Sequence, residues 1–233
     1  LSDSLGMNGG LRADAPIMNQ HLIEAFTQSG LHAANVSYFD LPGLEGIHEL
    51  GAQAPEFAVS ANISGPDNVQ THRIVQVGEW KIGITGITKP DSSFAPNPSY
   101  QIQDPVESAV HTLKKMAKKT DYMVLLAFDA AEEAKSIAQA FPDLDLIVDT
   151  RQHRHHSPPI RMGQTLWVKT HYQTMRLGEL RVQVLQDGSF ELVVDRKIDM
   201  DAQIPDDPIT QQSMLNARSK IHVVQSELFG LDE

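Results

Sequence analysis

The sequence predicts a layered α/β fold. Three observations predict it: apolar strands alternate with helices from residue 80 to residue 148, residues 122–128 form one continuously apolar strand, and two dipeptides, Gly78-Glu79 and Asp187-Gly188, mark hairpin turns. A strand that is apolar throughout is expected to be covered on both faces. The 233 residues of the chain are enough for one large domain or two small ones.

The first half of the chain begins with a helix over residues 14–30. Asp14 caps this helix, Pro16 suits its first turn, and Gly30 ends it. Pro42 and Gly43 break the strand that follows. The remaining elements predicted in this half are strand 33–39, helix 44–52, strand 57–63 and the hairpin strands 71–77 and 80–88.

The second half begins with a long loop, residues 89–103, and a helix from Asp104-Pro105 to about residue 119, which Glu107 supports as an acidic early position. We expect a first domain over residues 1–200 and a linker with a C-terminal helix over residues 201–233. The further predicted elements are strand 122–128, helix 130–141, strand 144–148, strands 165–170, 177–185 and 190–194, and helix 208–228.

Composition narrows the classes of partner. The formal net charge of −11 argues against nucleic acid or an anionic membrane surface as the main partner. No apolar run approaches the roughly 18–20 residues that span a bilayer. The absence of cysteine rules out disulfides, thiolate metal sites and covalent c-type haem attachment within this chain.

A histidine-bearing loop follows the apolar strand 144–148. It carries His153, His155 and His156, and ligands of α/β proteins gather beyond the carboxyl ends of strands. One interpretation is that these imidazoles, with His171 as a further group, bind a single divalent transition metal. The other is that they are solvated loop histidines.

The order of several segments resembles the metallophosphoesterase domain of the 5′-nucleotidase (calcineurin-like) family. The segments are SANIS (60–64), WKIGITGITKP (80–90), YMVLLAF (122–128), DLIV (145–148), GQTLWV (163–168) and RLGEL (176–180). The resemblance implies a four-layer αββα sandwich with a two-metal site at the strand ends, and hydrolysis of phosphate esters such as nucleotides. The family's first Asp-x-His strand has no counterpart, so the domain is expected to be N-terminally incomplete.

Several ligand positions implied by this resemblance hold other residues. The Gly-Asp aspartate could correspond to Asp3, while Tyr38 and Phe39 stand at the asparagine and histidine of the Gly-Asn-His-Glu turn. Phe128 lies near the position of a strand-end histidine, and the Gly-His-x-His loop corresponds to His153 to His155. Aromatic rings cannot replace these ligands around a dication, so the resemblance implies a degenerate active site.

We therefore expect a non-catalytic binding or scaffold module. The ANVSYFDLPG segment (34–43) resembles degenerate relatives found with multihaem c-type cytochromes. This implies a periplasmic or extracellular setting and a multihaem cytochrome as a possible partner. Two alternatives stay open: an active metal-dependent phosphoesterase whose missing ligands lie on a segment absent here, and a single-metal binding protein that uses the histidine loop.

The C-terminal helix carries a narrow apolar seam, typical of a helix that packs against another helix. We expect it to dock on a second domain or protein partner; the alternative is that it covers the sheet of its own chain. The seam residues are Met214, Ala217, Ile221, Val224 and Leu228.

Overall fold

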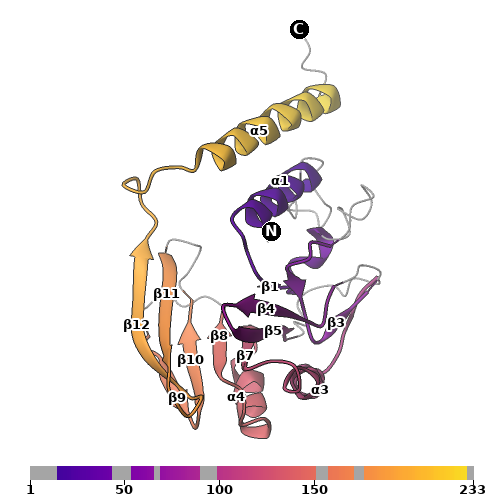
Figure 1. Cartoon of the computed structure of the whole chain (residues 1–233). Coiled ribbons are helices and arrows are strands. Elements are labelled where there is room, and N and C mark those ends of the chain that lie inside the picture. Colours follow the sequence, from indigo (N-terminus) through magenta and orange to yellow (C-terminus); the bar gives the residue numbers. More distant parts are fainter. Residues whose placement is uncertain are drawn as a thin grey trace.

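A computed structural model of the chain describes residues 15–43, 54–65, 69–89, 99–150, 157–170 and 176–229 (Figure 1). Its centre is a six-stranded sheet in the order β4-β5-β7-β8-β10-β9. Strands β5, β7, β8 and β10 are parallel, and β4 and β9 are antiparallel edge strands. The strands are β4 (His72–Val77), β5 (Trp80–Thr88), β7 (Tyr122–Phe128), β8 (Leu146–Asp149), β9 (Ile160–Met162) and β10 (Thr165–Lys169).

One face of this sheet packs against helices α3 (Pro105–Met116) and α4 (Ala131–Ala140). In β7, the residues that point to this face alternate with those that point away, and Leu125 is completely buried against Leu113 and Ile137 of the helix layer. The main hydrophobic core therefore lies between the sheet and these two helices, where apolar burial contributes most to folding.

The second face of the sheet has lighter cover. On β7 its residues are half-buried, although the apolar sequence predicted full cover on both sides. A two-stranded ribbon, β11 (Arg176–Val184) with β12 (Phe190–Asp199), reaches this face at Tyr122. The ring of Tyr122 lies 6.3 Å from that of Phe190, and its hydroxyl donates to the carbonyl of Gly188 at 3.0 Å. The cover is thus made of short separate pieces.

Another piece of this layer is the parallel pair β1 (Ala34–Asn35) and β2 (Ala58–Val59). Asn35 approaches β5 so closely that a Cβ on Gly86 would lie 2.1 Å from its Oδ1 atom. The Asn35 amide also donates to the carbonyl of Ile87 at 2.7 Å. Gly86 is therefore the residue that lets β1 pack closely on the sheet.

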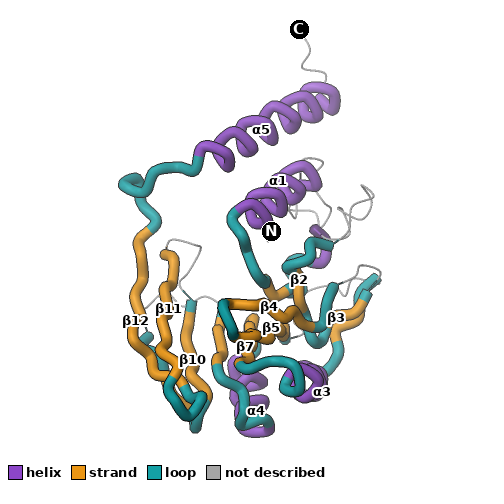
Figure 2. The backbone as a smooth tube through the Cα atoms, in the orientation of Figure 1, coloured by secondary structure: helices purple, strands orange, loops and turns teal. Residues whose placement is uncertain are grey.

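Helices α1 (Ala15–Gln28) and α5 (Pro208–Phe229) lie side by side as an outer layer, although their contacting residues His21 and Ser213 are 192 positions apart in sequence (Figures 1 and 2). His21 is buried between them, with Nδ1 2.9 Å from Ser213 Oγ and Nε2 3.4 Å from Lys220 Nζ. The layers run helices, sheet, short strands, helices, which confirms the predicted αββα architecture.

The predicted cap of α3 and both predicted hairpin turns are present, and the structure also has a cap at the start of α5. Asp104 accepts a hydrogen bond from the amide of Glu107 at 2.8 Å and caps α3, and Asp207 does the same for Thr210 at the start of α5. Gly78 and Gly188 have positive φ at the two hairpin turns. Local sequence signals therefore fixed these element ends correctly.

Other predicted boundaries were wrong. Strand 33–39 shortens to two residues, because the Asp40 carboxylate accepts from the amide and hydroxyl of Ser37 and closes a turn. Strand 57–63 divides into β2 and β3 (Ile63–Ser64), since the Ser60 hydroxyl accepts from the Ile63 amide at 3.2 Å. The short strand β6 (Gln101–Ile102) lies in the predicted loop 89–103 and pairs with β3. Strand β12 extends five residues further than predicted. The predicted helix 44–52 lies outside the described residues.

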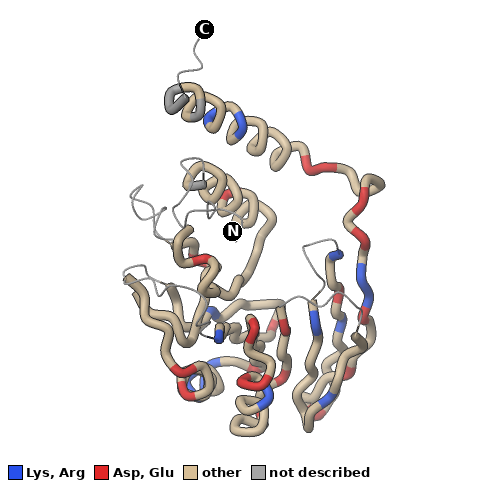
Figure 3. Tube along the Cα trace, turned by 180° about the vertical axis from the view of Figure 1, so that it is seen from behind, with Lys and Arg blue, Asp and Glu red and all other residues tan. Residues whose placement is uncertain are grey.

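Charge is interspersed on the β11–β12 ribbon (Figure 3). Arg176 pairs with Asp199, and Glu179 pairs with Arg181 and Arg196. These exposed pairs contribute little to stability but leave the ribbon nearly neutral locally. In the described part of the chain, no helix is long and apolar enough to cross a bilayer.

Candidate functional site

The candidate site lies at the carboxyl ends of the parallel strands, and we call this side of the sheet its carboxyl edge. Register brings Thr88 beside Phe128 and Ala127 beside Asp149, so β5, β7 and β8 finish together. Ligands of open α/β sheets bind at this edge. Two groups of side chains occupy it: three aromatic rings, and a set of buried polar residues.

The three rings belong to Tyr38, Phe39 and Phe128, which we call the aromatic cluster. Ring centroids lie 4.4 Å apart for Tyr38 and Phe39, and 5.8 Å from Phe128 to each of the other two. Tyr38 is buried, and the other two rings are half-buried. The structure thus brings together the three residues that the resemblance placed at lost ligand positions, although they are up to 90 positions apart in sequence.

The chemistry of this cluster is apolar. Phenylalanine has no donor atom for a divalent cation, and the phenol of tyrosine holds its proton near neutral pH. Edge-to-face ring pairs are instead stabilising by about 0.5–1.5 kcal/mol each beyond the area that they bury. The residues at these positions therefore do not fit a two-metal centre.

The turn that carries two of the rings is fixed by Asp40. Its Oδ2 atom accepts from the amide of Ser37 at 2.9 Å and from the Ser37 hydroxyl at 2.7 Å. Burial raises the pKa of Asp40, and the two Ser37 hydrogen bonds oppose that rise. The carboxyl acts as a local clamp on the turn.

The polar residues at this edge hold the backbone. The buried Asn62 side chain accepts from the Thr88 amide at 3.1 Å and donates to the Thr88 and Gln103 carbonyls at 2.8 and 3.1 Å. Thr150 donates from its hydroxyl to the Ala127 carbonyl at 3.0 Å. Sequence reasoning missed Asn62; its one signal was an amide in an apolar segment, where a buried amide requires partners.

One salt bridge lies at the rim of the site. Lys89, just beyond β5, lies 3.2 Å from Glu133 of α4 and is half-exposed. Asp149 is buried at the end of β8. Sequence reasoning missed this residue as well, although an aspartate that directly follows an apolar strand is a signal for this edge.

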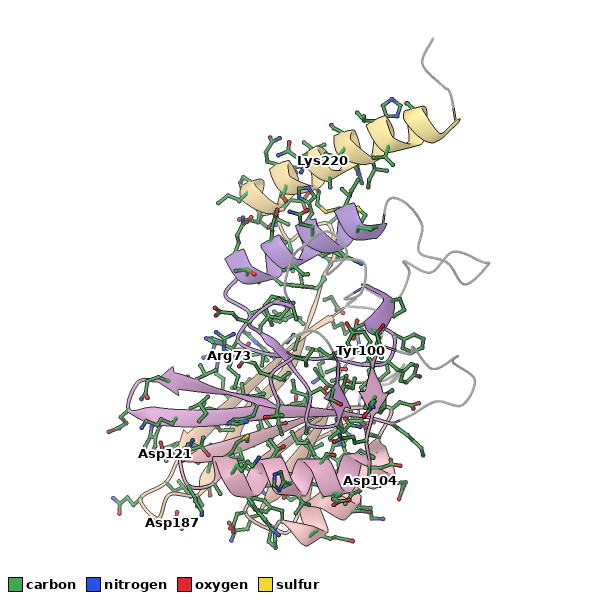
Figure 4. The ribbon with its side chains drawn as sticks, turned by 90° about the vertical axis from the view of Figure 1, so that its right-hand side faces the viewer. Arg73, Tyr100, Asp104, Asp121, Asp187 and Lys220 are labelled. Carbon is green, nitrogen blue, oxygen red and sulfur yellow. The ribbon has the colours of Figure 1, made fainter. Side chains whose placement is uncertain are left out.

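A second carboxyl with a raised pKa, that of Asp145, lies at the opposite side of the sheet, where the parallel strands begin. Burial raises the pKa of Asp145 to about 6, the Met123 amide opposes the rise by donating to it at 2.7 Å, and the charge of Asp143 adds to it. Figure 4 shows Asp121 and Asp187 near this edge. Each has a local role: Asp121 accepts from the Lys81 amide, and Asp187 accepts from Ser189.

The histidine-loop prediction lies outside the described residues. His153, His155, His156 and His171 fall in segments 151–156 and 171–175, and Asp3 lies before residue 15. Within the ranges that the structure describes, no group of three or more histidine, aspartate or glutamate side chains could hold a metal ion. A single metal on the loop therefore stays a prediction.

Part of the predicted docking seam of α5 packs against α1. Ala217 is fully buried, and Met214, Ile221 and Val224 are half-buried. Because Ser213 and Lys220 of the same helix contact His21, this side of α5 faces α1 of its own chain rather than the sheet. The side chain of Leu228 is outside the described part, and docking on a second protein stays a prediction.

Comparison with solved structures identifies the fold. NAD nucleotidase of Haemophilus influenzae superposes with a TM-score of 0.70 at 14% identity, covering 88% of this chain and 48% of its own. A 5′-nucleotidase precursor of Thermus thermophilus gives 0.67 at 18% identity, covering 90% and 47%. A sulfate thiohydrolase of Thermus thermophilus gives 0.67 at 16% identity, covering 86% and 39%.

The chain therefore spans less than half the length of these solved proteins. No family model matches it, and no curated protein matches it. At these identities the likeness establishes the 5′-nucleotidase (metallophosphoesterase) fold. Activity does not follow from fold, since function belongs to the site.

Proposed function

We propose that this chain, which has the 5′-nucleotidase fold, is a non-catalytic binding or scaffold module. The observation that carries the proposal is the aromatic cluster. Tyr38, Phe39 and Phe128 contact one another at the strand ends where a two-metal hydrolase needs carboxylates, amides and imidazoles.

The cluster is also a reason for this site to resist metal. Two-metal hydrolysis requires cations about 3.5–4 Å apart around a bridging hydroxide. Opening the cluster to admit them would give up the contacts between three rings and expose apolar surface, at about 25 cal/mol per Å². The rings thus favour a packed, dry edge of the sheet over a hydrated ionic one.

The test measures metal binding and hydrolysis on the same sample. We expect fewer than two equivalents of Mn²⁺ or Zn²⁺ per chain after loading and dialysis, and no turnover of a nucleotide or of nitrophenyl phosphate. The matched control is the chain with Phe128→Leu, which keeps an apolar residue but removes a ring, and it should be equally inactive. Two bound equivalents with hydrolysis in the wild-type chain would reject the proposal.

We propose in addition that the module works outside the cytoplasm, in an electron-transfer assembly with a multihaem cytochrome. The support is the resemblance of residues 34–43 to degenerate relatives of that kind and the net charge of −11, which suits a basic partner. Binding to an immobilised basic multihaem cytochrome should weaken as salt rises from 20 to 300 mM on the order of tenfold. Equal binding to an acidic cytochrome would contradict this pairing.

A further inference from the structure

Strand β4 forms an open edge of the main sheet. Among the described strands it pairs with β5 alone. Lys81 of β5 bonds away from β4, since its amide donates to the Asp121 carboxylate at 2.7 Å and its carbonyl accepts from the Asp121 amide at 2.8 Å. Its partner Gln76 therefore belongs to a pair without ladder bonds, and by alternation the backbone N–H and C=O groups of Ile74 and Gln76 point outward.

The outward groups of β4 form a template for a further strand. Among the described residues, no backbone hydrogen bond reaches them from another segment. Ile74 is 37% exposed and Val77 is 49% exposed, so the edge is apolar as well as unpaired. An extended segment of another protein adds to such an edge through main-chain hydrogen bonds, which supply affinity, while its alternate side chains supply specificity.

The C-terminal end of α3 lies against one face of the β4–β5 hairpin (Figure 4). A Cβ on Gly83, the β5 partner of Ile74, would lie 2.9 Å from both Met116 Cε and Thr120 Cγ2. Because side chains alternate along a strand, Ile74 points to the face that α3 covers and Arg73 points to the other. A side chain of an added strand that lies opposite Ile74 is therefore next to the end of α3.

That end of α3 is basic. Lys115 and Lys119 are exposed and lie one helical turn apart, on the same side of the helix. Burial lowers the pKa of His72 of β4, and the charges of Lys119 and Lys115 lower it further, so both ammonium groups lie near this strand. Within the described residues neither lysine forms a salt bridge. Although the chain carries a net charge of −11, this face of the edge is locally positive.

The opposite face of the edge is apolar. Val75 and Val77 point to it, and the Trp80 ring follows them beyond the turn, 36% exposed and 5.7 Å from the Tyr122 ring. The side chains of an added strand alternate between the two faces. They therefore meet ammonium groups on one face and apolar side chains on the other, and cross-strand neighbours of this kind select their partners.

We propose that β4 binds an extended segment of a partner protein in which acidic residues alternate with apolar ones. The segment adds as a strand to the outer edge of β4. Its carboxylates lie beside Lys115 and Lys119, and its apolar side chains pack along Val75, Val77 and Trp80. At physiological salt the Debye length is about 8 Å, so these two lysines act on the segment more strongly than distant acidic groups of the chain. This inference rests on the binding function proposed above and names a class of partner for it.

The experiment titrates the full chain with the end-capped peptides SEVEVEVS and SKVKVKVS, followed by calorimetry and by NMR shifts of the β4 amides. We expect the acidic peptide to bind on the order of tenfold more tightly than the basic one and to shift the amides of Ile74 and Gln76. N-methylation of the central amides of the acidic peptide should abolish binding, because it removes the donors that pair with β4.

Ile74→Pro should also abolish binding while the Tm is kept, since the N–H that is lost points outward and proline is tolerated at such positions of an edge strand. If this substitution unfolds the hairpin, the comparison of N-methylated with unmodified peptide on the wild-type chain decides whether the edge is used. Lys115→Gln with Lys119→Gln should weaken the acidic peptide about fivefold, as expected for the loss of two exposed ion pairs.

The matched control is Lys114→Gln with Lys118→Gln. It removes the same charge from the same helix, but each lysine is one position earlier and so on a different side of α3, and the affinity should not change. Equal affinity for the acidic and basic peptides, undiminished binding of the N-methylated peptide, or no binding of the acidic peptide at millimolar concentration would overturn the proposal. Metal uptake and turnover do not enter this titration, so a hydrolytic chain would reject the scaffold function and leave the peptide result standing.

Discussion

Gly86→Ala tests how β1 is attached to the sheet. A methyl group built on Gly86 would lie 2.1 Å from Oδ1, 2.5 Å from Cγ and 2.8 Å from Cβ of Asn35. These distances are far below van der Waals contact, so Asn35 must move. Moving it breaks the 2.7 Å hydrogen bond from its amide to the Ile87 carbonyl.

The magnitude follows from two terms. Overpacking by one methyl group typically costs about 1–3 kcal/mol. The lost hydrogen bond adds about 1 kcal/mol, because the Ile87 carbonyl stays buried. We expect Gly86→Ala to lower the free energy of unfolding by about 2–4 kcal/mol, where most single substitutions cost about 1 kcal/mol.

The assay is urea unfolding followed by circular dichroism, and the companion variant is Gly86→Ala with Asn35→Ala. Removing the Asn35 side chain takes away the atoms that clash, so the double variant should be more stable than Gly86→Ala alone. In a double-mutant cycle the two changes should couple by more than 1 kcal/mol. A stable Gly86→Ala chain, or additive effects of the two changes, would refute this account of the packing.

Three further results are expected from charge and capping. Asp145→Asn should stabilise the fold by about 1 kcal/mol above pH 6. The pKa of Asp145 in the wild-type chain rises from about 3.9 in the unfolded state to about 6 in the folded state, so wild-type stability is highest below pH 4 and declines as the pH rises through 6. Partial solvent screening of Asp145 reduces the size of this effect. Urea titrations at pH 4 and pH 8 should show a difference between variant and wild type only at pH 8. Asp104→Ala should cost about 1 kcal/mol in thermal unfolding because the α3 cap is lost, and an unchanged Tm would argue against the cap. If His153 and His155 bind one metal, its affinity should fall below about pH 6, and changing both to alanine should abolish binding with stability kept within about 0.5 kcal/mol; calorimetry with Zn²⁺ distinguishes this from unchanged binding.

The C-terminal helix offers a separate test. Ile221→Asp with Leu228→Asp should release a bound partner or oligomer, as seen by light scattering, while the sheet domain keeps its Tm. A large fall in Tm with unchanged mass would mean that the helix is part of the core of its own chain. Its contact with α1 makes this control essential.

Local patterns in the sequence predicted the fold where one segment decides its own conformation. The apolar run of β7, the Asp104 cap and the hairpin glycines are such cases. Predictions failed where a side chain hydrogen-bonds the backbone three positions away: Asp40 ends β1 by bonding Ser37, and Ser60 interrupts the next strand by bonding Ile63. A polar side chain that bonds the backbone competes with a strand ladder, and sequence periodicity does not register it.

The residues of the candidate site were predicted because they stand at the ligand positions of the family that the sequence resembles, and not because their own side chains indicated a site. The resemblance singled out Tyr38, Phe39 and Phe128, but the sequence could not indicate that their rings contact one another. Such contacts depend on how the turn after β1 folds over the end of β7. The role of Asn62 could not be predicted for the same reason, since its hydrogen bonds join residues from separate segments.

The pairing of α1 with α5 has a consequence for how the protein opens. Forming it requires closure of a loop of roughly two hundred residues, so it should come late in folding. Among the described elements α5 packs mainly against α1, so it can detach without disturbing the sheet. In hydrogen exchange the amides of α5 should therefore exchange through a low-energy opening, while those of β7 require global unfolding. Helix α5 should therefore behave as a separate unit of local unfolding, whose free energy of opening does not depend on the stability of the core.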